Sequence, residues 1–295
     1  MRIGVTGASG QLGMATVRHL LSRASASDIV AITRTPDKLA GYSSQGVTVR
    51  AGDFNDAVGL GKAFSGVERL LIIPGSDLTP NVRPVQHRTA IQAAMSAGVD
   101  HIIYVSSIGA RPGLSDGIME THFASEQALI TSGATWTLLR MSIYAETLLN
   151  GAKQALSTHT YSALRGAPAA YIVRDDLAAA AAGLLTTKGH EGITYHASGP
   201  ASLTAPQIAD IIARVARTTV QFSAMTVGQL ESVFANIGLP PVVANAVSRF
   251  QQALQAGAFD VVTGDVERLS GRPAESVENF LSRNLGESNA NTGHA

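Results

Sequence analysis

A glycine-rich segment near the amino terminus constrains the fold of this chain most strongly. It reads Gly7-Ala8-Ser9-Gly10-Gln11-Leu12-Gly13 and lies between an apolar run at residues 2–5 and an amphipathic segment at 11–21. A strand, a glycine turn and a helix in this order are typical of the first unit of a parallel sheet that binds a dinucleotide. The alternative is an ordinary glycine-rich loop without a ligand. The agreement of strand, loop and helix favours the dinucleotide.

The first 140 residues alternate between short apolar runs and longer amphipathic segments. We expect strands at residues 2–5, 29–33, 47–49, 69–73, 101–105 and 135–139, and helices at 11–21, 56–64, 84–97 and 121–131. This rhythm predicts an α/β fold of the Rossmann type, a doubly wound parallel sheet covered by helices on both faces.

After about residue 150 the pattern becomes mainly helical. We expect helices at 175–185, 205–217, 227–237, 242–254 and 273–284, and one strand at 193–197. The predicted organisation is a dinucleotide-binding domain at 1–150 and a smaller substrate-binding lobe at 151–285 that packs on it. A polar, disordered tail is expected at 286–295.

The composition excludes several classes of function. The chain has no cysteine, so disulfides, thiolate catalysis and cysteine-ligated metal sites are absent. Its 22 basic and 22 acidic residues give a formal net charge of zero, which argues against nucleic-acid binding. The longest apolar run, Leu177–Leu185, is about half of what a membrane span needs. We expect a cytoplasmic protein without a targeting signal, and without a metal because no His, Asp or Glu cluster has ligand spacing.

The residues after the second expected strand indicate which dinucleotide binds. Proteins that bind a cofactor without a 2′-phosphate usually have an acidic residue at this place. This chain has Arg34 there and Lys38 shortly after it. A guanidinium can hold a phosphate through two hydrogen bonds, whereas the alternative for Arg34 is a solvated surface position. We therefore predict NADPH rather than NADH.

Two further segments complete the predicted cofactor site. Asp53 follows the third strand, where it can accept a hydrogen bond from adenine or serve as a turn residue or helix cap. The loop after the fourth strand is expected to pass the ribose. The predicted cofactor-binding residues are Gly7, Ser9, Gly10, Gln11, Leu12, Arg34, Lys38, Asp53, Pro74 and Ser76.

Several motifs together resemble a known family. They are the glycine loop, Arg34, Val49-Arg50-Ala51-Gly52-Asp53-Phe54, Gln86-His87, His122-x-x-x-Glu126, Thr137-Leu138-Leu139-Arg140, Gly189-His190-Glu191-Gly192, Gly238-Leu239-Pro240 and Leu269-Ser270-Gly271-Arg272-Pro273. They resemble atypical short-chain dehydrogenase/reductases of the NmrA-like branch, and within it the bacterial NADPH:quinone oxidoreductases and triphenylmethane reductases. The resemblance extends to about residue 284.

The chain departs from the wider superfamily in its proton relay. That superfamily commonly uses Tyr-x-x-x-Lys, and no tyrosine here has a lysine four positions later. The resemblance implies that hydride goes directly to an electron-poor acceptor. Relatives usually carry Asn after the Thr-Leu-Leu-Arg-like strand, whereas this chain has Met141, whose thioether cannot donate a hydrogen bond. We interpret Met141 as an apolar wall of the pocket.

Other polar residues are candidates for the chemistry. Ser106, Ser107, His122 and Tyr144 are the predicted catalytic residues, and Ile108, Met141, Ser142 and Tyr144 are the predicted substrate-binding residues. The serines end the fifth strand, where they can polarise a substrate or merely close the strand. His122 is either a general acid, since histidine titrates near neutral pH, or a structural residue, for example in a local pair with Glu126.

The leading hypothesis is an NADPH-dependent oxidoreductase that delivers hydride to a small electron acceptor, most naturally a quinone. One alternative is a sensor of NADP(H) redox state that does not turn over, and another is a ketone or imine reductase. The expected partner is a small molecule. The sequence does not decide whether the chain forms a homodimer.

Overall fold

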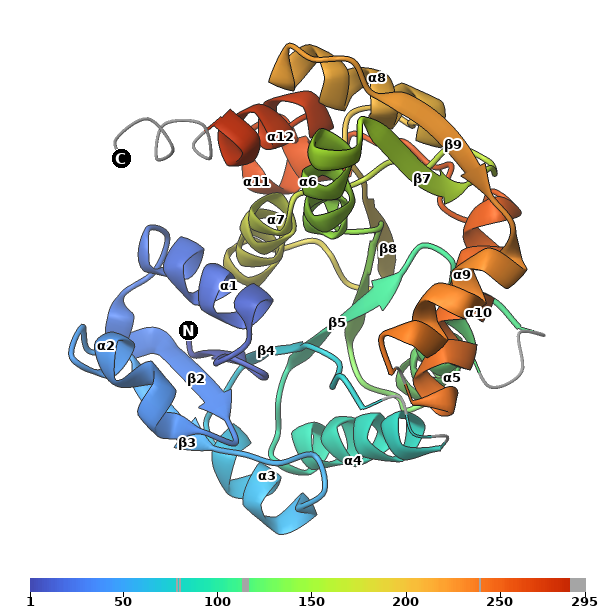
Figure 1. Cartoon of the computed structure of the whole chain (residues 1–295). Helices are drawn as coiled ribbons and strands as arrows, with labels where there is room; N and C mark the ends of the chain where they lie inside the picture. Colours follow the sequence, from blue (N-terminus) through green and yellow to red (C-terminus); the bar gives the residue numbers. More distant parts are fainter. Residues whose placement is uncertain (78, 80, 113–116, 239, 287–295) are drawn as a thin grey trace.

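A parallel sheet forms the centre of the molecule (Figure 1). The computed structural model describes residues 1–77, 79, 81–112, 117–238 and 240–286, and within them seven strands pair in the order β3-β2-β1-β4-β5-β6-β8. The strands are β1 (Ile3–Val5), β2 (Ile29–Thr33), β3 (Thr48–Ala51), β4 (Arg69–Ile72), β5 (His101–Ser107), β6 (Trp136–Met141) and β8 (Ile193–Ala197). All neighbours are parallel, and the strand order reverses at β1. The predicted Rossmann-type fold is confirmed.

Side chains along each strand alternate between the two faces of this sheet. In β4, Leu70 and Ile72 pack on one face, whereas Leu71 between them packs on the other. Such alternation follows from the period of two residues in a strand. Because helices bury both faces, the strands read as nearly continuous apolar runs, which is why the sequence pattern predicted them.

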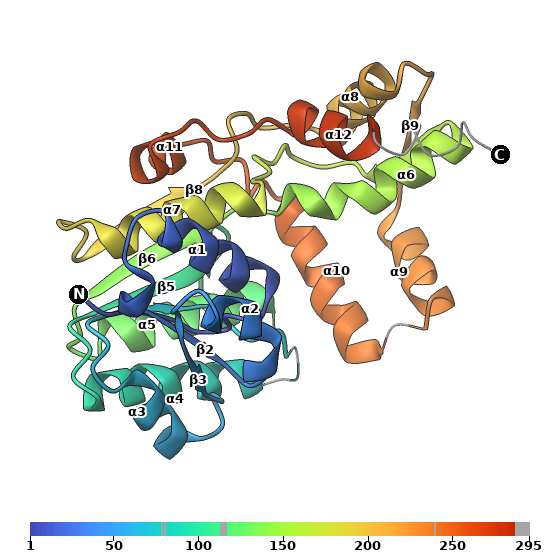
Figure 2. The same ribbon diagram turned by 90° about the vertical axis from the view of Figure 1, so that its left-hand side faces the viewer.

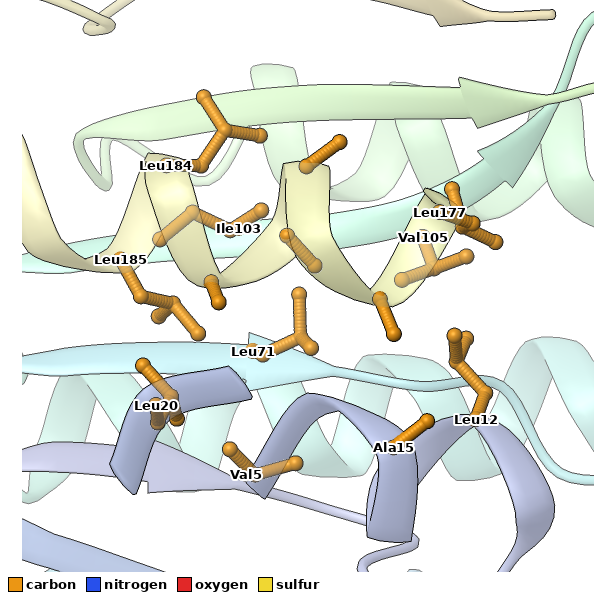
Figure 3. Close-up of a cluster of buried hydrophobic side chains, with 14 of the residues drawn as sticks. Val5, Leu12, Ala15, Leu20, Leu71, Ile103, Val105, Leu177, Leu184 and Leu185 are labelled. Atoms are coloured by element: carbon orange, nitrogen blue, oxygen red, sulfur yellow. The ribbon is translucent and has the colours of Figure 1, made fainter. Parts of the chain in front are cut away.

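Helices form a layer on each face of the sheet (Figures 1 and 2). α1 (Gln11–Leu21) and α7 (Arg174–Thr186) cover one face, and α3 (Ala57–Phe64), α4 (Val82–Ser96) and α5 (Ile118–Ile130) cover the other. Figure 3 shows the first layer, in which side chains of α1 and α7 meet above Leu71 and Ile103 of the sheet. The alanine side chains of α7 are short, so this helix is buried along almost its whole length.

The remaining elements form a smaller lobe and short connections. The lobe contains α6 (Leu148–Thr158), β7 (Thr160–Leu164), α8 (Ala205–Ala216), β9 (Gln221–Met225), α9 (Val227–Asn236), α10 (Pro241–Gln255) and α12 (Val277–Gly286), while α11 (Asp265–Ser270) packs on α7. Connections contain η1 (Ala26–Asp28), η2 (Pro36–Leu39), α2 (Ala40–Ser43) and η3 (Ala145–Thr147). Figure 2 shows α9 and α10 extending from the lobe beside the sheet domain.

The structure differs from the sequence prediction in the second half of the chain. The predicted boundary at residue 150 does not separate the two regions cleanly, because α7 and β8 return to the sheet domain. The β7–β9 pair was not expected, since its two short strands meet only across a long separation in sequence. The last helix begins at Val277 rather than at residue 273. From residue 287 onward, the predicted tail lies outside the described residues.

A buried carboxylate joins two strands and a helix at the carboxyl edge of the sheet. Glu126 of α5 is 1% exposed, and it accepts hydrogen bonds from Arg140 Nε at 2.8 Å and Arg140 Nη2 at 2.5 Å. Ser106 Oγ donates to the same carboxylate at 2.5 Å. A two-point contact of this kind fixes direction as well as distance. It therefore holds the ends of β5 and β6 in place against α5.

We predict opposite stability effects for the same substitution at two helical glycines. A Cβ on Gly183 would lie 1.9 Å from the Leu269 carbonyl oxygen, whereas a Cβ on Gly61 of α3 would meet nothing within 4 Å. Gly183→Ala should lower the free energy of unfolding by about 1–3 kcal/mol, because α11 must move. Gly61→Ala should raise it by about 0.5–1 kcal/mol through helix propensity. Urea titrations followed by circular dichroism measure both; equal effects would contradict the close packing of α7 on α11.

The Glu126 contact predicts a further stability effect. Glu126→Gln removes the charge that pairs with Arg140, and losing one partner of a buried pair costs roughly 3–5 kcal/mol. Since Arg140 keeps 23% side-chain exposure, we expect a loss of about 2–3 kcal/mol of unfolding free energy in urea. The exposed pair Arg214–Glu278 supplies the control, because Glu278→Gln should change little. Equal losses in both variants would rule out this role of Glu126.

Candidate active site

The glycine loop forms a tight turn that ends directly in α1. Gly7 has φ +60°, and the Gly10 N–H donates to the Gly7 carbonyl oxygen at 2.9 Å. A Cβ on Gly13 would lie 2.3 Å from that same oxygen, so only glycine fits there. The first turn of α1 has no acidic residue, and its N-cap, Gly10, provides no side-chain cap. The helix therefore presents its amino-terminal N–H groups and positive dipole end to an anion.

Hydroxyl groups tie this loop to the end of β2. Ser9 Oγ lies 2.6 Å from Thr33 Oγ1, and Thr35 Oγ1 donates to Ser9 Oγ at 3.2 Å. Arg34 stands between these two threonines and is exposed, and Lys38 is exposed one turn later in η2. The loop and the cation predicted to bind the 2′-phosphate are thus held on the same side of the sheet. These residues suit an NADPH phosphate, and the role of each stays a prediction.

The other predicted cofactor residues lie beside this loop. Asp53 is half-buried, and its Oδ1 accepts from the backbone N–H of Asn55 at 2.9 Å and from its Nδ2 at 3.0 Å. This is the turn role that the sequence left open, and it leaves the adenine contact as a prediction. Pro74 is half-buried and Ser76 exposed after β4. Thr6 Oγ1 accepts from the Ile73 N–H at 2.9 Å, which joins the ends of β1 and β4.

A largely apolar pocket opens beyond the ends of β5 and β6. Its volume is about 440 Å³, within the usual range for small-molecule sites. It lies at the same carboxyl edge of the sheet as the glycine loop, with β4 between β1 and β5. Its lining includes the predicted residues Ser107, His122, Met141, Ser142 and Tyr144, but not Ser106 or Ile108. Residues of α10, among them Phe250 and Leu254, form another wall.

The two serines of β5 have different surroundings. Ser106 is fully buried and donates to Glu126, which places it among the structural contacts and not in the pocket, contrary to its predicted catalytic role. Ser107 lines the pocket and donates to the Met119 sulfur at 3.3 Å. A thioether is a weak acceptor, so this hydroxyl is only loosely held. Only Ser107 of the pair can therefore contact a ligand in this arrangement. Ile108 is buried next to the pocket wall.

The surroundings of His122 do not suit the general acid that was one of its two predicted roles. It is 4% exposed, and Arg83 Nη2 lies 3.4 Å from its Nε2. Burial, together with the charge of Arg83, holds the pKa of His122 well below its ordinary value. It stays neutral at physiological pH and cannot release a proton as an imidazolium. The predicted local pair with Glu126 is also wrong, because Glu126 bonds to Arg140 and Ser106.

Tyrosine side chains contribute the other polar groups of the pocket. Tyr144 lies under the Arg174 guanidinium, whose carbon is 4.5 Å from the ring centre, and burial raises the pKa of Tyr144 to about 12. Tyr161 and Tyr171 also line the pocket, and burial raises their pKa values too. Neither tyrosine was predicted from the sequence as a site residue, and neither was Phe259. No local motif marks them, because the lobe brings them together only on folding.

The described residues provide neither a metal-binding cluster nor a membrane-spanning helix. No group of three or more His, Asp or Glu side chains in that part of the chain could hold a metal ion. No helix within the same residues is long and apolar enough to cross a membrane.

Comparisons with known proteins show the family to which this chain is similar. The family model described as NAD(P)H-binding matches residues 7–188. Quinone oxidoreductase 2 of Escherichia coli K12 is 33% identical over 96% of this chain and 99% of its own length. The structure of the E. coli NADPH-dependent quinone oxidoreductase complexed with NADPH superposes with a TM-score of 0.90 at 32% identity, covering 96% and 99% of the two chains.

A second solved structure has similar agreement. The Citrobacter sp. triphenylmethane reductase complexed with NADP(H) gives a TM-score of 0.88 at 30% identity, again covering 96% and 99% of the two chains. Both matches extend over the sheet domain and the smaller lobe. The resemblance drawn from the sequence motifs is thereby confirmed: this chain belongs to the NAD(P)H-binding family, in its NmrA-like branch.

Proposed function

We propose that the protein is an NADPH-dependent oxidoreductase that delivers hydride to a small, flat, electron-poor acceptor, with a quinone as the preferred class. The observation that carries this proposal is an apolar pocket at the sheet edge that also bears the glycine loop. The relative and the solved structure named as quinone oxidoreductases support the acceptor class. The cytoplasmic location and the homodimer stay predictions.

The residues of the glycine loop and of β2 suit the cofactor. The N–H groups at the start of α1 would hold the diphosphate, and Arg34 and Lys38 would hold the 2′-phosphate. When bound, NADPH supplies the hydride. The protein's part is to position the cofactor and acceptor against each other and to keep water out of the pocket. Much of the rate enhancement then comes from this orientation.

The polar groups of the pocket fit an acceptor that needs little acid catalysis. His122 is neutral, and the phenol of Tyr144 keeps its proton up to about pH 12. A quinone that gains a hydride becomes a weakly basic phenolate, which takes its proton from water. The products would be the hydroquinone and NADP⁺. This balance requires no proton relay of the Tyr-x-x-x-Lys type.

The first experiment measures acceptor-dependent oxidation of NADPH. Purified protein is mixed with NADPH and a panel of benzoquinones and naphthoquinones, and the loss of reduced cofactor is followed by absorbance. We expect oxidation that requires both enzyme and quinone, with formation of hydroquinone. Binding of NADPH without any acceptor-dependent oxidation would instead support the sensor hypothesis. Turnover of ketones or imines alone would support the alternative of a ketone or imine reductase, in which Ser107 polarises the substrate.

The second experiment tests the choice of cofactor. Arg34→Ala should weaken NADPH binding about 10- to 100-fold, because a hydrogen-bonded charged contact is worth roughly 1.5–3 kcal/mol. Affinity for NADH should change little, since NADH has no 2′-phosphate. Lys62→Ala is the matched control, because it removes an exposed positive charge from the end of α3. Titration calorimetry with both cofactors gives the values, and an unchanged preference for NADPH in the Arg34 variant would exclude this role.

A further inference from the structure

His122 occupies an unusual place in the wall of the pocket. It projects from α5, lines the cavity and is buried against a cationic side chain, Arg83 of α4. Arg83 is itself 7% exposed. Among the described residues no carboxylate forms a salt bridge with Arg83. The imidazole is therefore the group that receives a hydrogen bond from this buried charge.

The contact with Arg83 decides which nitrogen of His122 carries the proton. A guanidinium has only donors, so Arg83 Nη2 donates and His122 Nε2 must accept across their 3.4 Å separation. Neutral imidazole carries one proton, which then resides on Nδ1. That Nδ1 atom is buried and has no hydrogen-bond partner among the described residues. A buried N–H without a partner is costly and calls for an explanation.

A second buried donor lines the same cavity. Ser142 follows β6, is 1% exposed, and its Oγ also has no hydrogen-bond partner within the described part of the chain. Two other unpartnered atoms nearby, Arg83 Nε and His87 Nε2, belong to residues that do not line the pocket. The pocket is otherwise mostly apolar. His122 Nδ1–H and Ser142 Oγ–H are thus two buried donors without a described partner, and both belong to residues that line one pocket.

We propose that His122 Nδ1–H and Ser142 Oγ–H bind the carbonyl oxygen of the acceptor and stabilise the negative charge that it gains. This inference rests on the proposed reduction of a carbonyl-containing acceptor. It gives His122 the role of a neutral hydrogen-bond donor, and Arg83 the role of a positioning residue that sets the tautomer. Donors placed where an oxyanion develops act most strongly in a site that excludes water.

The surroundings of His122 keep it in this form. Arg83 and His87 face it from α4, and Tyr104 faces it from β5 with ring centres 6.3 Å apart. Burial comes first and the positive charge of Arg83 second in keeping the pKa of His122 low. The pKa of His87 is lowered to about 3, so it adds no charge, and burial raises the pKa of Tyr104. The proton that completes the hydroquinone therefore comes from water and not from these groups.

The tautomer can be read without any turnover. Protein labelled with ¹⁵N in its histidine rings should show a neutral His122 with the proton on Nδ1, unchanged between pH 5.5 and 8.5. In Arg83→Met that preference should weaken or reverse, because the donor to Nε2 is lost. A proton on Nε2 in the wild type, or titration of His122 near pH 6.5, would overturn the proposal.

Kinetics of two replacements at His122 test its contact with the acceptor. His122→Asn keeps an N–H donor near the position of Nδ1, and His122→Leu removes it at similar size. We expect kcat with a quinone to fall 10- to 100-fold in His122→Leu and to recover in part in His122→Asn, with NADPH affinity unchanged in both. His101→Asn serves as the control, because that buried histidine lies at the start of β5, away from the pocket.

The outcomes separate this inference from the proposed function. No quinone-dependent oxidation by the wild type refutes the function, whereas normal turnover by His122→Leu refutes only the role of the histidine. Ser142→Ala, which removes a hydroxyl without adding bulk, should lower kcat several-fold. It provides an independent arm if His122→Leu does not fold, and an unchanged kcat in Ser142→Ala would remove the serine from the site.

Discussion

The close approach of α1 to its own glycine loop determines where the other layers of this molecule lie. Since Gly13 touches the Gly7 carbonyl, α1 starts directly above the end of β1 and its dipole points at the crevice. The short side chains of α7 then pack against α1 over the same face of the sheet. α7 thereby returns to the sheet after the first part of the lobe. The chain then continues into β8, which pairs with β6 at the edge of the sheet. The glycine contact thus bears on the placement of α7 as well as on the predicted cofactor crevice.

A second constraint acts at the apolar pocket, where the proposed acceptor would bind. Glu126 links the ends of β5 and β6 to α5, and the last residues of these two strands line the pocket. The carboxylate itself is buried and does not line the pocket. Its contribution is to orient the backbone from which Ser107, Met141 and Ser142 project. Two different contacts therefore hold the two parts of the proposed site: a glycine turn at the cofactor end, and a buried ion pair beside the pocket.

Local patterns predicted the fold and the class of cofactor. These patterns are the glycine loop, the arginine after β2 and the apolar strands. Each consists of residues that are neighbours in sequence, so it can be recognised without a structure. Ser106 and Glu126 are twenty positions apart, and Arg140 completes their contact from another strand. Sequence spacing could not show that the serine hydroxyl was already engaged. The same reason explains why Tyr161, Tyr171 and the β7–β9 pair were missed.

Arg83 does not line the pocket, yet its buried positive charge changes the protonation of His122, which does line it. From sequence alone a histidine near the acceptor is read as an acid, because its ordinary pKa lies near neutrality. Beside Arg83 a second positive charge would have to share a buried region with the first, so the imidazole stays neutral. A neutral imidazole loses its role as an acid but keeps one N–H donor, and the arginine leaves Nδ1 to carry it. Such a residue suits a particular kind of acceptor. The negative charge that develops on this acceptor needs a hydrogen-bond donor, and its proton can come from water.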